Sequence, residues 1–225
     1  MTGHAFRQAR TNAGLSQVEA AARLGVSQTL LSLMENGERS VTPAVAAWAV
    51  AHLHATPEQL PVYPETRHSD DQLAADFGAL GYPGYGYLQS QPRNPAEVLF
   101  DALNRPDLDA RLVEALPWLP LRYSNMDWNW LARQAKVHNL QNRLGFVVAL
   151  SARVAKRQEK REVVKRLSQV LKTLEEGRLA KTDTLCQESW PPSQRKFAHK
   201  QRSRLAAHWG LDTRLTEENL AHLAA

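Results

Sequence analysis

Residues 16–37 constrain the fold of this chain more than any other segment, because they contain two short helix signals separated by one glycine. Ser16 and Glu19 have the spacing of a capping box, which predicts that a helix begins at once after Ser16. Gly25 can take the positive φ of a tight turn, and Ser27 then caps a second helix. Two helices joined by so short a turn must cross steeply. The segment therefore predicts a helix-turn-helix, whose second helix can enter the major groove of DNA.

The same positions resemble a known family of DNA-binding proteins. The motifs that match Cro and phage repressors, also called the XRE family, are Leu15-Ser16-Gln17, Ala20, Leu24-Gly25-Val26-Ser27, Leu31-Ser32 and Glu35-Asn36-Gly37. The resemblance covers about residues 3–60 and implies a five-helix bundle. Its expected core is Phe6, Ala9, Leu15, Ala20, Leu24, Val26, Leu31, Met34, Val45, Trp48, Ala49 and Leu53. The alternative is a helical hairpin with no role in DNA binding.

The resemblance also implies which side chains would face DNA. They are Gln17, Ser27, Gln28, Thr29, Ser32, Leu33 and Arg39. Gln28 lies at the start of the second helix, and its amide can bond to both N6 and N7 of adenine. Thr29 can form a hydrogen bond or contact a thymine methyl group. Gln17 begins the first helix, where family members hold a backbone phosphate. Leu33 departs from the family pattern, since many relatives have a polar or basic residue there.

The charge of residues 1–60 predicts little electrostatic attraction to DNA. Residues 1–60 contain four basic and four acidic side chains. Affinity for DNA depends largely on neutralising phosphates. A neutral DNA-binding domain therefore needs dimerisation, a basic region elsewhere in the chain, or both.

Size and composition limit the remaining possibilities. The chain has 225 residues, so about 165 residues remain for a second domain. It contains no run of 18 apolar residues, and its first residues lack an apolar signal core, so we expect neither a membrane span nor export. A single cysteine, Cys186, excludes an internal disulfide and fits the cytoplasm. The net charge of +5 favours an acidic partner.

Three regions follow from the pattern along the chain. Residues 1–60 form the helix-turn-helix domain, residues 61–94 a linker and irregular loop, and residues 95–225 an all-helical partner-binding or dimerisation domain. One short helix is expected over 71–80. The Gly-Tyr-Pro-rich segment after it predicts a loop whose tyrosines either pin it to the protein or stack on a partner. Spacing of i, i+3 and i+4 dominates throughout, so the fold class is all-α.

Several helices are expected in the C-terminal region. They cover residues 96–104, a segment that begins at Asp107 or Asp109, a segment capped by Asp127, and residues 141–158. Three tryptophans, Trp118, Trp128 and Trp130, mark either a buried core or a binding hot spot.

Parts of this region resemble antitoxin-type regulators encoded beside nucleotidyltransferase toxins of the abortive-infection E class. The stretches concerned begin at Leu103, Met126 and Gln141. The likeness rests on their general pattern. It suggests a cognate toxin as a partner and implies no chemistry.

Positive charge is concentrated near the C-terminus. Residues 133–204 contain eighteen basic and six acidic side chains, whereas residues 61–132 contain five and ten. One long helix is expected through the first of two basic clusters. The basic residues singled out are Lys156, Arg157, Lys160, Arg161, Lys165, Arg166, Arg195, Lys196, Lys200 and Arg202. Three interpretations remain open: a solvated helix face, contact with DNA phosphates beside the helix-turn-helix, or docking to an acidic protein or RNA.

Signatures of catalysis are missing from the sequence. It contains no phosphate-binding GxxxxGK[ST] loop, HExxH or Gly-x-Ser-x-Gly motif. Cys186 has no paired cysteine and is expected in the core, while His52 and His54 face different directions on a helix. We therefore expect no enzyme activity, no cofactor and no metal.

The leading hypothesis is a sequence-specific regulator of transcription. It would be a repressor that binds a double-stranded operator as a homodimer. Within this hypothesis, an antitoxin that represses its own toxin–antitoxin operon is favoured. The alternatives are a protein-neutralising antitoxin or adaptor that binds DNA weakly or not at all, and an RNA-binding protein that uses the basic C-terminal third.

Overall fold

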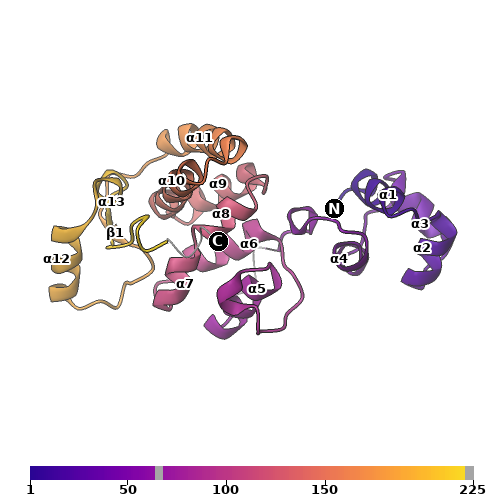
Figure 1. The fold of residues 1–225 in the computed structure, drawn as a ribbon, viewed down its shortest axis with the longest axis horizontal. Coiled ribbons are helices and arrows are strands. Elements are labelled where there is room, and N and C mark those ends of the chain that lie inside the picture. The colour runs from indigo at the N-terminus through magenta and orange to yellow at the C-terminus, as the bar shows by residue number, and fades with distance from the viewer. Residues whose placement is uncertain (64–67, 221–225) are drawn as a thin grey trace.

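The computed structural model describes residues 1–63 and 68–220. A small N-terminal domain lies at one end of an elongated molecule, and a larger helical body makes up the rest (Figure 1). The first domain contains α1 (Gly3–Asn12), α2 (Gln17–Leu24), α3 (Gln28–Glu35), α4 (Pro43–His52) and the 3₁₀ turn η1 (Pro57–Gln59). The expected fifth helix of the bundle is thus a single 3₁₀ turn.

The N-terminal domain forms around one small apolar core. Phe6 of α1, Leu31 and Met34 of α3, and Val45 and Ala49 of α4 are buried in it. Ala20, Ala21 and Leu53 complete the buried set. The remaining residues expected in this core, Ala9, Leu15, Leu24, Val26 and Trp48, are half-buried and pack against it.

The body begins earlier in the chain than the sequence predicted. Its elements are α5 (Asp70–Ala79), the 3₁₀ turn η2 (Pro83–Tyr85), α6 (Pro95–Leu103), α7 (Ala110–Ala115), α8 (Trp118–Arg122), α9 (Trp128–Val137), α10 (Gln141–Arg157), α11 (Arg161–Glu175), β1 (Asp183–Thr184), α12 (Pro192–Gln201), α13 (Arg204–His208) and β2 (Leu211–Asp212). Helices α6 and α10 lie in its centre, and the α10 side chains from Gln141 to Ser151 are all buried. An α-helical architecture is confirmed.

The assignment of residues 61–94 to a linker outside the body is wrong from Asp70 onward, although the helix expected over 71–80 is present as α5. Leu73 and Phe77 of α5 are fully buried in the main core, and Tyr82 and Tyr85 are buried beside them. These two tyrosines pin the loop to the body, while Tyr87 is exposed. Helix α5 belongs to the body because its apolar face must be covered, and the main core covers that face. Residues 64–67 of the predicted linker lie outside the described residues.

The expected long basic helix is two helices. Helix α10 ends at Arg157, and Glu159 takes a left-handed conformation with φ of +56°. The chain then reverses into α11, which packs along α10. Neither glycine nor proline marks this break, so the continuous apolar spacing concealed it.

Two very short strands were not expected. Residues Asp183 and Thr184 of β1 pair in parallel with Leu211 and Asp212 of β2. Two residues are too few to display the alternation that reveals a strand in a sequence. Their pairing fixes the segment after α11 to the segment after α13.

The other expectations for the C-terminal region agree with the structure at the level of elements. Asp127 caps α9, and Asp109, rather than Asp107, caps α7. Trp118 is buried, while Trp128 and Trp130 are half-buried against the same core, which favours packing over a binding hot spot. Residues 221–225 of the predicted domain lie outside the described residues. Among the described helices, none is both long and apolar enough to cross a membrane.

Candidate nucleic-acid interface

The turn between α2 and α3 has the geometry that the sequence predicted. The Ser16 side chain accepts a hydrogen bond from the Glu19 amide, and the Glu19 carboxylate accepts one from the Ser16 amide. Gly25 takes a left-handed φ of 69°, and the Ser27 hydroxyl then caps α3 by accepting from the Leu30 amide at 3.1 Å. The caps explain where each helix begins, because they satisfy amides that have no partner inside the helix.

The first turn of α3 presents polar side chains to solvent. Ser27, Gln28 and Thr29 are exposed, whereas Leu31 and Met34 on the opposite side of the helix are buried. Within residues 1–63 and 68–220, the side chains of Gln28 and Thr29 have no hydrogen-bond partner. Their donors and acceptors are therefore available to a ligand.

The predicted side chains further along the same surface are less exposed. Ser32 and Leu33 of α3 are half-buried, and Arg39 lies exposed after the helix. The Arg39 amide donates to the Leu33 carbonyl at 3.1 Å, so Arg39 is anchored close to the end of α3. The structure thus brings Ser27, Gln28, Thr29, Ser32, Leu33 and Arg39 together on or beside one helix.

Gln17 differs from its predicted role. Its side chain is half-buried, and its amide donates a hydrogen bond to the Glu35 carboxylate at 2.9 Å. The prediction that this side chain faces a phosphate does not describe the conformation observed. A neighbouring carboxylate, which the sequence pattern did not place beside Gln17, holds the amide.

That carboxylate is the centre of a buried ion pair that sequence reasoning missed. Arg10 of α1 donates to both oxygens of Glu35, at 2.5 and 2.9 Å, and also donates to the Leu15 carbonyl at 2.6 Å. Both Arg10 and Glu35 are buried. Burial alone would raise the pKa of Glu35, but the hydrogen bonds from Arg10 and Gln17, together with the positive charges of Arg10 and Arg7, lower it below its ordinary value. The pair ties α1, α2 and α3 into one rigid unit.

The sequence comparison agrees with this geometry. Residues 3–62 match the family model of a helix-turn-helix domain. No curated protein and no solved structure matches the chain. The match ends where η1 joins the body, so it covers the N-terminal domain alone. A helix-turn-helix domain is typical of DNA-binding regulators.

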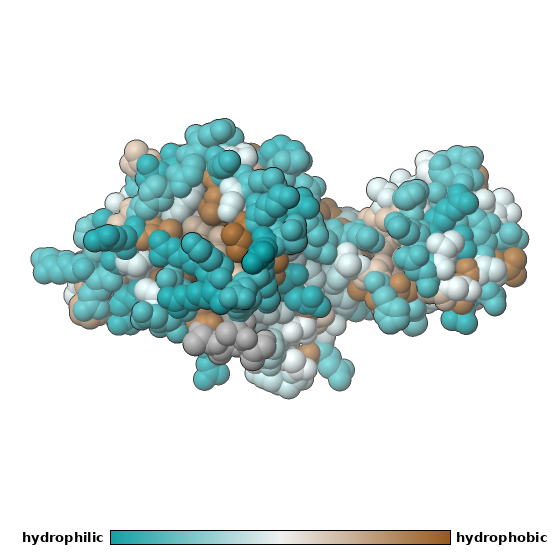
Figure 2. All heavy atoms as spheres, turned by 45° about the horizontal axis from the view of Figure 1, so that its top comes forward, coloured by the Kyte–Doolittle hydropathy of each residue, from teal (hydrophilic) through white to brown (hydrophobic). Residues whose placement is uncertain are grey.

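The first basic cluster lies on the body, away from the helix-turn-helix domain. All six side chains are exposed: Lys156 and Arg157 at the end of α10, Lys160 directly before α11, and Arg161, Lys165 and Arg166 on α11. Figure 1 shows α11 on the body, whereas α2 and α3 form the far end of the N-terminal domain. In a space-filling view, hydrophilic side chains dominate this part of the body, with small apolar patches between them (Figure 2). Within one chain, this cluster does not adjoin the exposed turn of α3.

The second basic cluster is still more distant, because α12 and α3 lie at opposite ends of the molecule (Figure 1). Two of its four predicted residues also have internal partners. Arg195 donates to the carbonyls of Trp190 and Glu188, and Arg202 pairs with Asp212 at 3.0 Å. Lys196 and Lys200 remain exposed. Within one chain, this cluster therefore does not lie beside α3.

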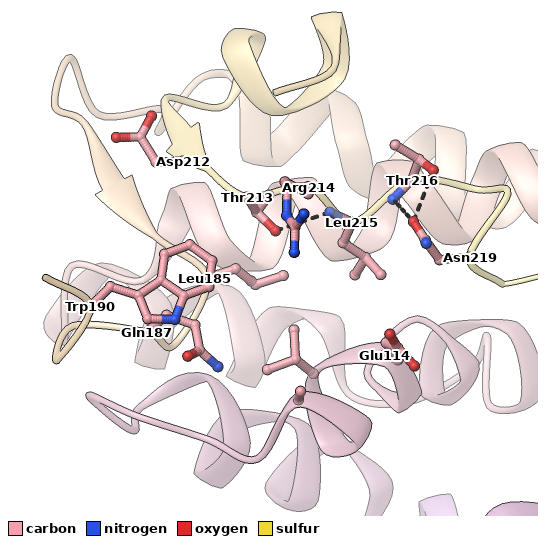
Figure 3. Close-up of a pocket in the computed structure, with 12 residues that line it drawn as sticks. Glu114, Leu185, Gln187, Trp190, Asp212, Thr213, Arg214, Leu215, Thr216 and Asn219 are labelled. Atoms are coloured by element: carbon pink, nitrogen blue, oxygen red, sulfur yellow. Dashed lines mark hydrogen bonds between the residues drawn. The ribbon is translucent and has the colours of Figure 1, made fainter. Parts of the chain in front are cut away.

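A cavity of about 430 Å³ lies between α7 and the segment that follows β2 (Figure 3). Trp190 and Gln187 line one end, Glu114 lies toward the other, and Arg214 points into the space between them. None of the buried polar atoms that lack a hydrogen bond in the described residues belongs to this lining. Nothing in its chemistry selects one ligand class, so we assign it none.

Two further candidates for chemistry, Cys186 and Arg143, are buried in the body. Cys186 is fully buried, and burial raises the pKa of its thiol to about 12, so it is not a nucleophile at neutral pH. Arg143, also buried, lies 3.9 Å from the Cys186 Sγ and pairs with Asp183 and Glu188. No cluster of three or more metal-ligating side chains occurs in the described part of the chain.

Proposed function

We propose that this protein is a sequence-specific regulator of transcription that reads double-stranded DNA with α3. The observation that carries the proposal is the exposed first turn of α3, where Gln28 and Thr29 have no partners among the described residues. The buried Arg10–Glu35 pair supports it, because a rigid attachment of α3 keeps these side chains oriented. The proposed function is binding, with no catalytic step.

Each residue on this surface has a role in the proposal. Gln28 would bond to an adenine edge, and Thr29 would bond to a base or contact a thymine methyl group. Leu33 would read methyl groups only, since it has no donor or acceptor. Ser27, Ser32 and Arg39 would contact the backbone, where Arg39 supplies the charge.

Dimerisation belongs to the proposal because the domain is electrically balanced. Its four basic and four acidic side chains include Arg10 and Glu35, which neutralise each other inside the protein. Two copies would double the contacts on a near-palindromic operator, with recognition helices about 34–36 Å apart. An assignment to the Cro and phage-repressor group, and action as a repressor, are parts of this proposal.

The finer proposal is an antitoxin that represses its own toxin–antitoxin operon. Its support is the likeness of the C-terminal region stated above, together with a helical body large enough to hold a protein partner. Co-expression with the product of the adjacent gene tests it. Relief of toxicity and co-purification are expected, and a neighbour that is neither toxic nor bound would contradict it.

A binding measurement tests the proposal for DNA. Full-length protein would first select an operator from a random duplex library, and affinity would then be compared for the wild type and Gln28→Ala. We expect the variant to lose about 1–3 kcal/mol on the selected site, with little change on random duplex. Gln8→Ala is the matched control, because Gln8 is an exposed glutamine on α1.

Two results would contradict this assignment. If Gln28→Ala and Gln8→Ala bind the selected site equally well, α3 does not read bases. If no duplex is enriched, the second candidate function is favoured, in which the chain is a protein-neutralising adaptor or an RNA-binding protein. The electrically balanced domain and the distance of the basic clusters from α3 are the observations that keep this candidate.

A further inference from the structure

A groove of about 730 Å³ runs along the outer side of the α10–α11 hairpin. Ala149 and Ala152 line it from α10, and Val164, Ser168 and Leu171 line it from α11. The spacing of three and four residues puts each set on one stripe of its helix. Leu167 and Leu174 of α11 are buried in the main core, and Ala152, Val164 and Leu171 pack against that core while staying partly exposed, so the groove is an accessible edge of it.

Basic side chains form the rim of this groove. Arg153 and Lys156 lie on the α10 side, and Arg161 and Lys165 on the α11 side. All four are exposed, and Glu159 in the turn is the one acidic residue among the described residues of the lining. An apolar floor between two basic edges matches a ligand that has an apolar stripe flanked by negative charges.

The chain itself shows that this rim accepts carboxylates. Glu217, from the segment after β2, lies 3.3 Å from Arg153 and 3.2 Å from Arg157. Both arginine side chains are about half exposed, so water still solvates them and the ion pair is not required to offset a desolvation cost. Arg153 is shared between Glu217 and the groove rim, whereas Lys156, Arg161 and Lys165 have no ion-pair partner in the described part of the chain.

We propose that the groove binds an acidic amphipathic helix of a partner protein. Two adjacent helical stripes with small residues between them form a seat for a third helix, whose i, i+3, i+4 and i+7 side chains would enter it. Carboxylates beside that stripe would pair with both edges of the rim. A second copy of the same face is a poor occupant, because symmetric pairing would place one basic rim against the other. The inference goes beyond DNA binding and does not depend on α3.

A designed peptide tests the proposal on the full chain. The probe is a fluorescent helical peptide of roughly 18 residues, with leucines on one stripe and glutamates beside it. A matched peptide has lysines in place of the glutamates. We expect the acidic peptide to bind and the basic one to bind at least about tenfold more weakly.

Protein variants then locate the site. Arg161→Glu with Lys165→Glu reverses the rim, and Arg166→Glu with Lys172→Glu makes the same charge change on α11 outside the groove. Ser168→Trp fills the floor without altering charge, and Ala152→Gln fills it from α10 should the larger change disturb folding. We expect about tenfold weaker binding for the rim and floor variants, and less than about threefold for the control pair.

Three outcomes would overturn the proposal. Equal losses for the rim and control pairs would show general attraction to a basic protein. If peptide binding is weakened by the rim variants but by neither floor variant, and binding of an RNA or duplex DNA responds in the same way, the surface binds phosphates. A wild-type dimer that Ser168→Trp dissociates would show that a second copy occupies the groove. Binding of the operator by α3 stays intact in each case, so the two proposals fail separately.

Discussion

At the scale of single residues, the position of α3 depends on a buried carboxylate. Glu35 accepts hydrogen bonds from Arg10 and Gln17, and its side chain is fully buried. The Ser27 cap predicted that Gln28 and Thr29 begin α3, and the family resemblance implied that both face DNA. It did not predict the ion pair, because Arg10 and Glu35 are 25 positions apart and only folding brings them together.

Removal of this carboxylate should unfold the N-terminal domain selectively. Glu35→Ala leaves the Arg10 guanidinium buried without its partner, so we expect the domain to lose about 3–5 kcal/mol of unfolding free energy. Hydrogen–deuterium exchange of peptides from residues 1–63 measures this, and peptides from the body act as an internal reference. Glu38→Ala, at an exposed position, should change stability by less than about 0.5 kcal/mol. Similar exchange in both variants would contradict the role given to Glu35.

The same ion pair predicts how the domain responds to acid. The folded pKa of Glu35 lies below its ordinary value of 4.5. Its contribution to stability is therefore complete above the ordinary pKa and is lost as the pH falls through the lowered folded pKa. Between pH 7 and the ordinary pKa, Glu35 should add no slope. Denaturant unfolding at several pH values measures this, and Glu35→Gln should flatten the acidic slope, apart from a residual part due to Glu19. A slope that persists unchanged would contradict the prediction.

At the scale of elements, residues next to a helix start determine its cap, whereas packing depends on residues far apart in the chain. Ser16, Ser27 and Asp127 each mark the start of a helix, because one side chain satisfies amides two or three residues away. The end of α10 has no such signal, and the break at Glu159 follows from packing α11 back along α10. Packing also explains Gly145, whose absent side chain makes room for the ring of Trp209.

Gly145→Ala should destabilise the body, although alanine normally favours a helix by about 1 kcal/mol over glycine. A methyl group here would overlap the Trp209 indole, which is itself 1 % exposed and has no space to move. We expect a net loss of about 1–3 kcal/mol of unfolding free energy. Chemical denaturation followed by tryptophan fluorescence measures it. Gly86→Ala is the control, because a methyl group there makes only ordinary van der Waals contacts, 3.7 Å from the Pro83 carbonyl oxygen. A more stable Gly145→Ala protein would refute the packing argument.

At the scale of the whole molecule, one asparagine fastens the helix-turn-helix domain to the body. The Asn94 Nδ2 donates to the carbonyl oxygens of Leu60 and Glu58, at 2.7 and 3.1 Å, while its Oδ1 caps α6 by accepting from the Ala96 amide. The Tyr63 amide also donates to Glu97 of α6 at 3.1 Å. Contacts at the start of α6 therefore help to set the position of α3 relative to the α10–α11 groove.

Asn94→Asp should loosen this attachment without removing the helix cap. Aspartate keeps an oxygen that can cap α6, but it loses both Nδ2 donors and repels the two carbonyl oxygens. We expect faster hydrogen exchange in residues 57–62 and a larger radius of gyration by small-angle scattering, with the exchange within α1–α3 unchanged. Asn104→Asp, at the other end of α6, is the control. An unchanged radius and exchange would show that other contacts hold the domain.

The sequence alone determined the helix-turn-helix, the α-helical class, and the identity of Gln28 and Thr29 as the side chains at the start of α3. Each follows from local rules, in which a cap, a glycine or an apolar period acts within a few residues. Only the tertiary structure decided that Gln17 turns to Glu35, that α5 belongs to the body, and that the basic clusters lie away from α3. The physical reason is that burial and ion pairing join residues far apart in the chain, and a one-dimensional pattern contains no distance between them.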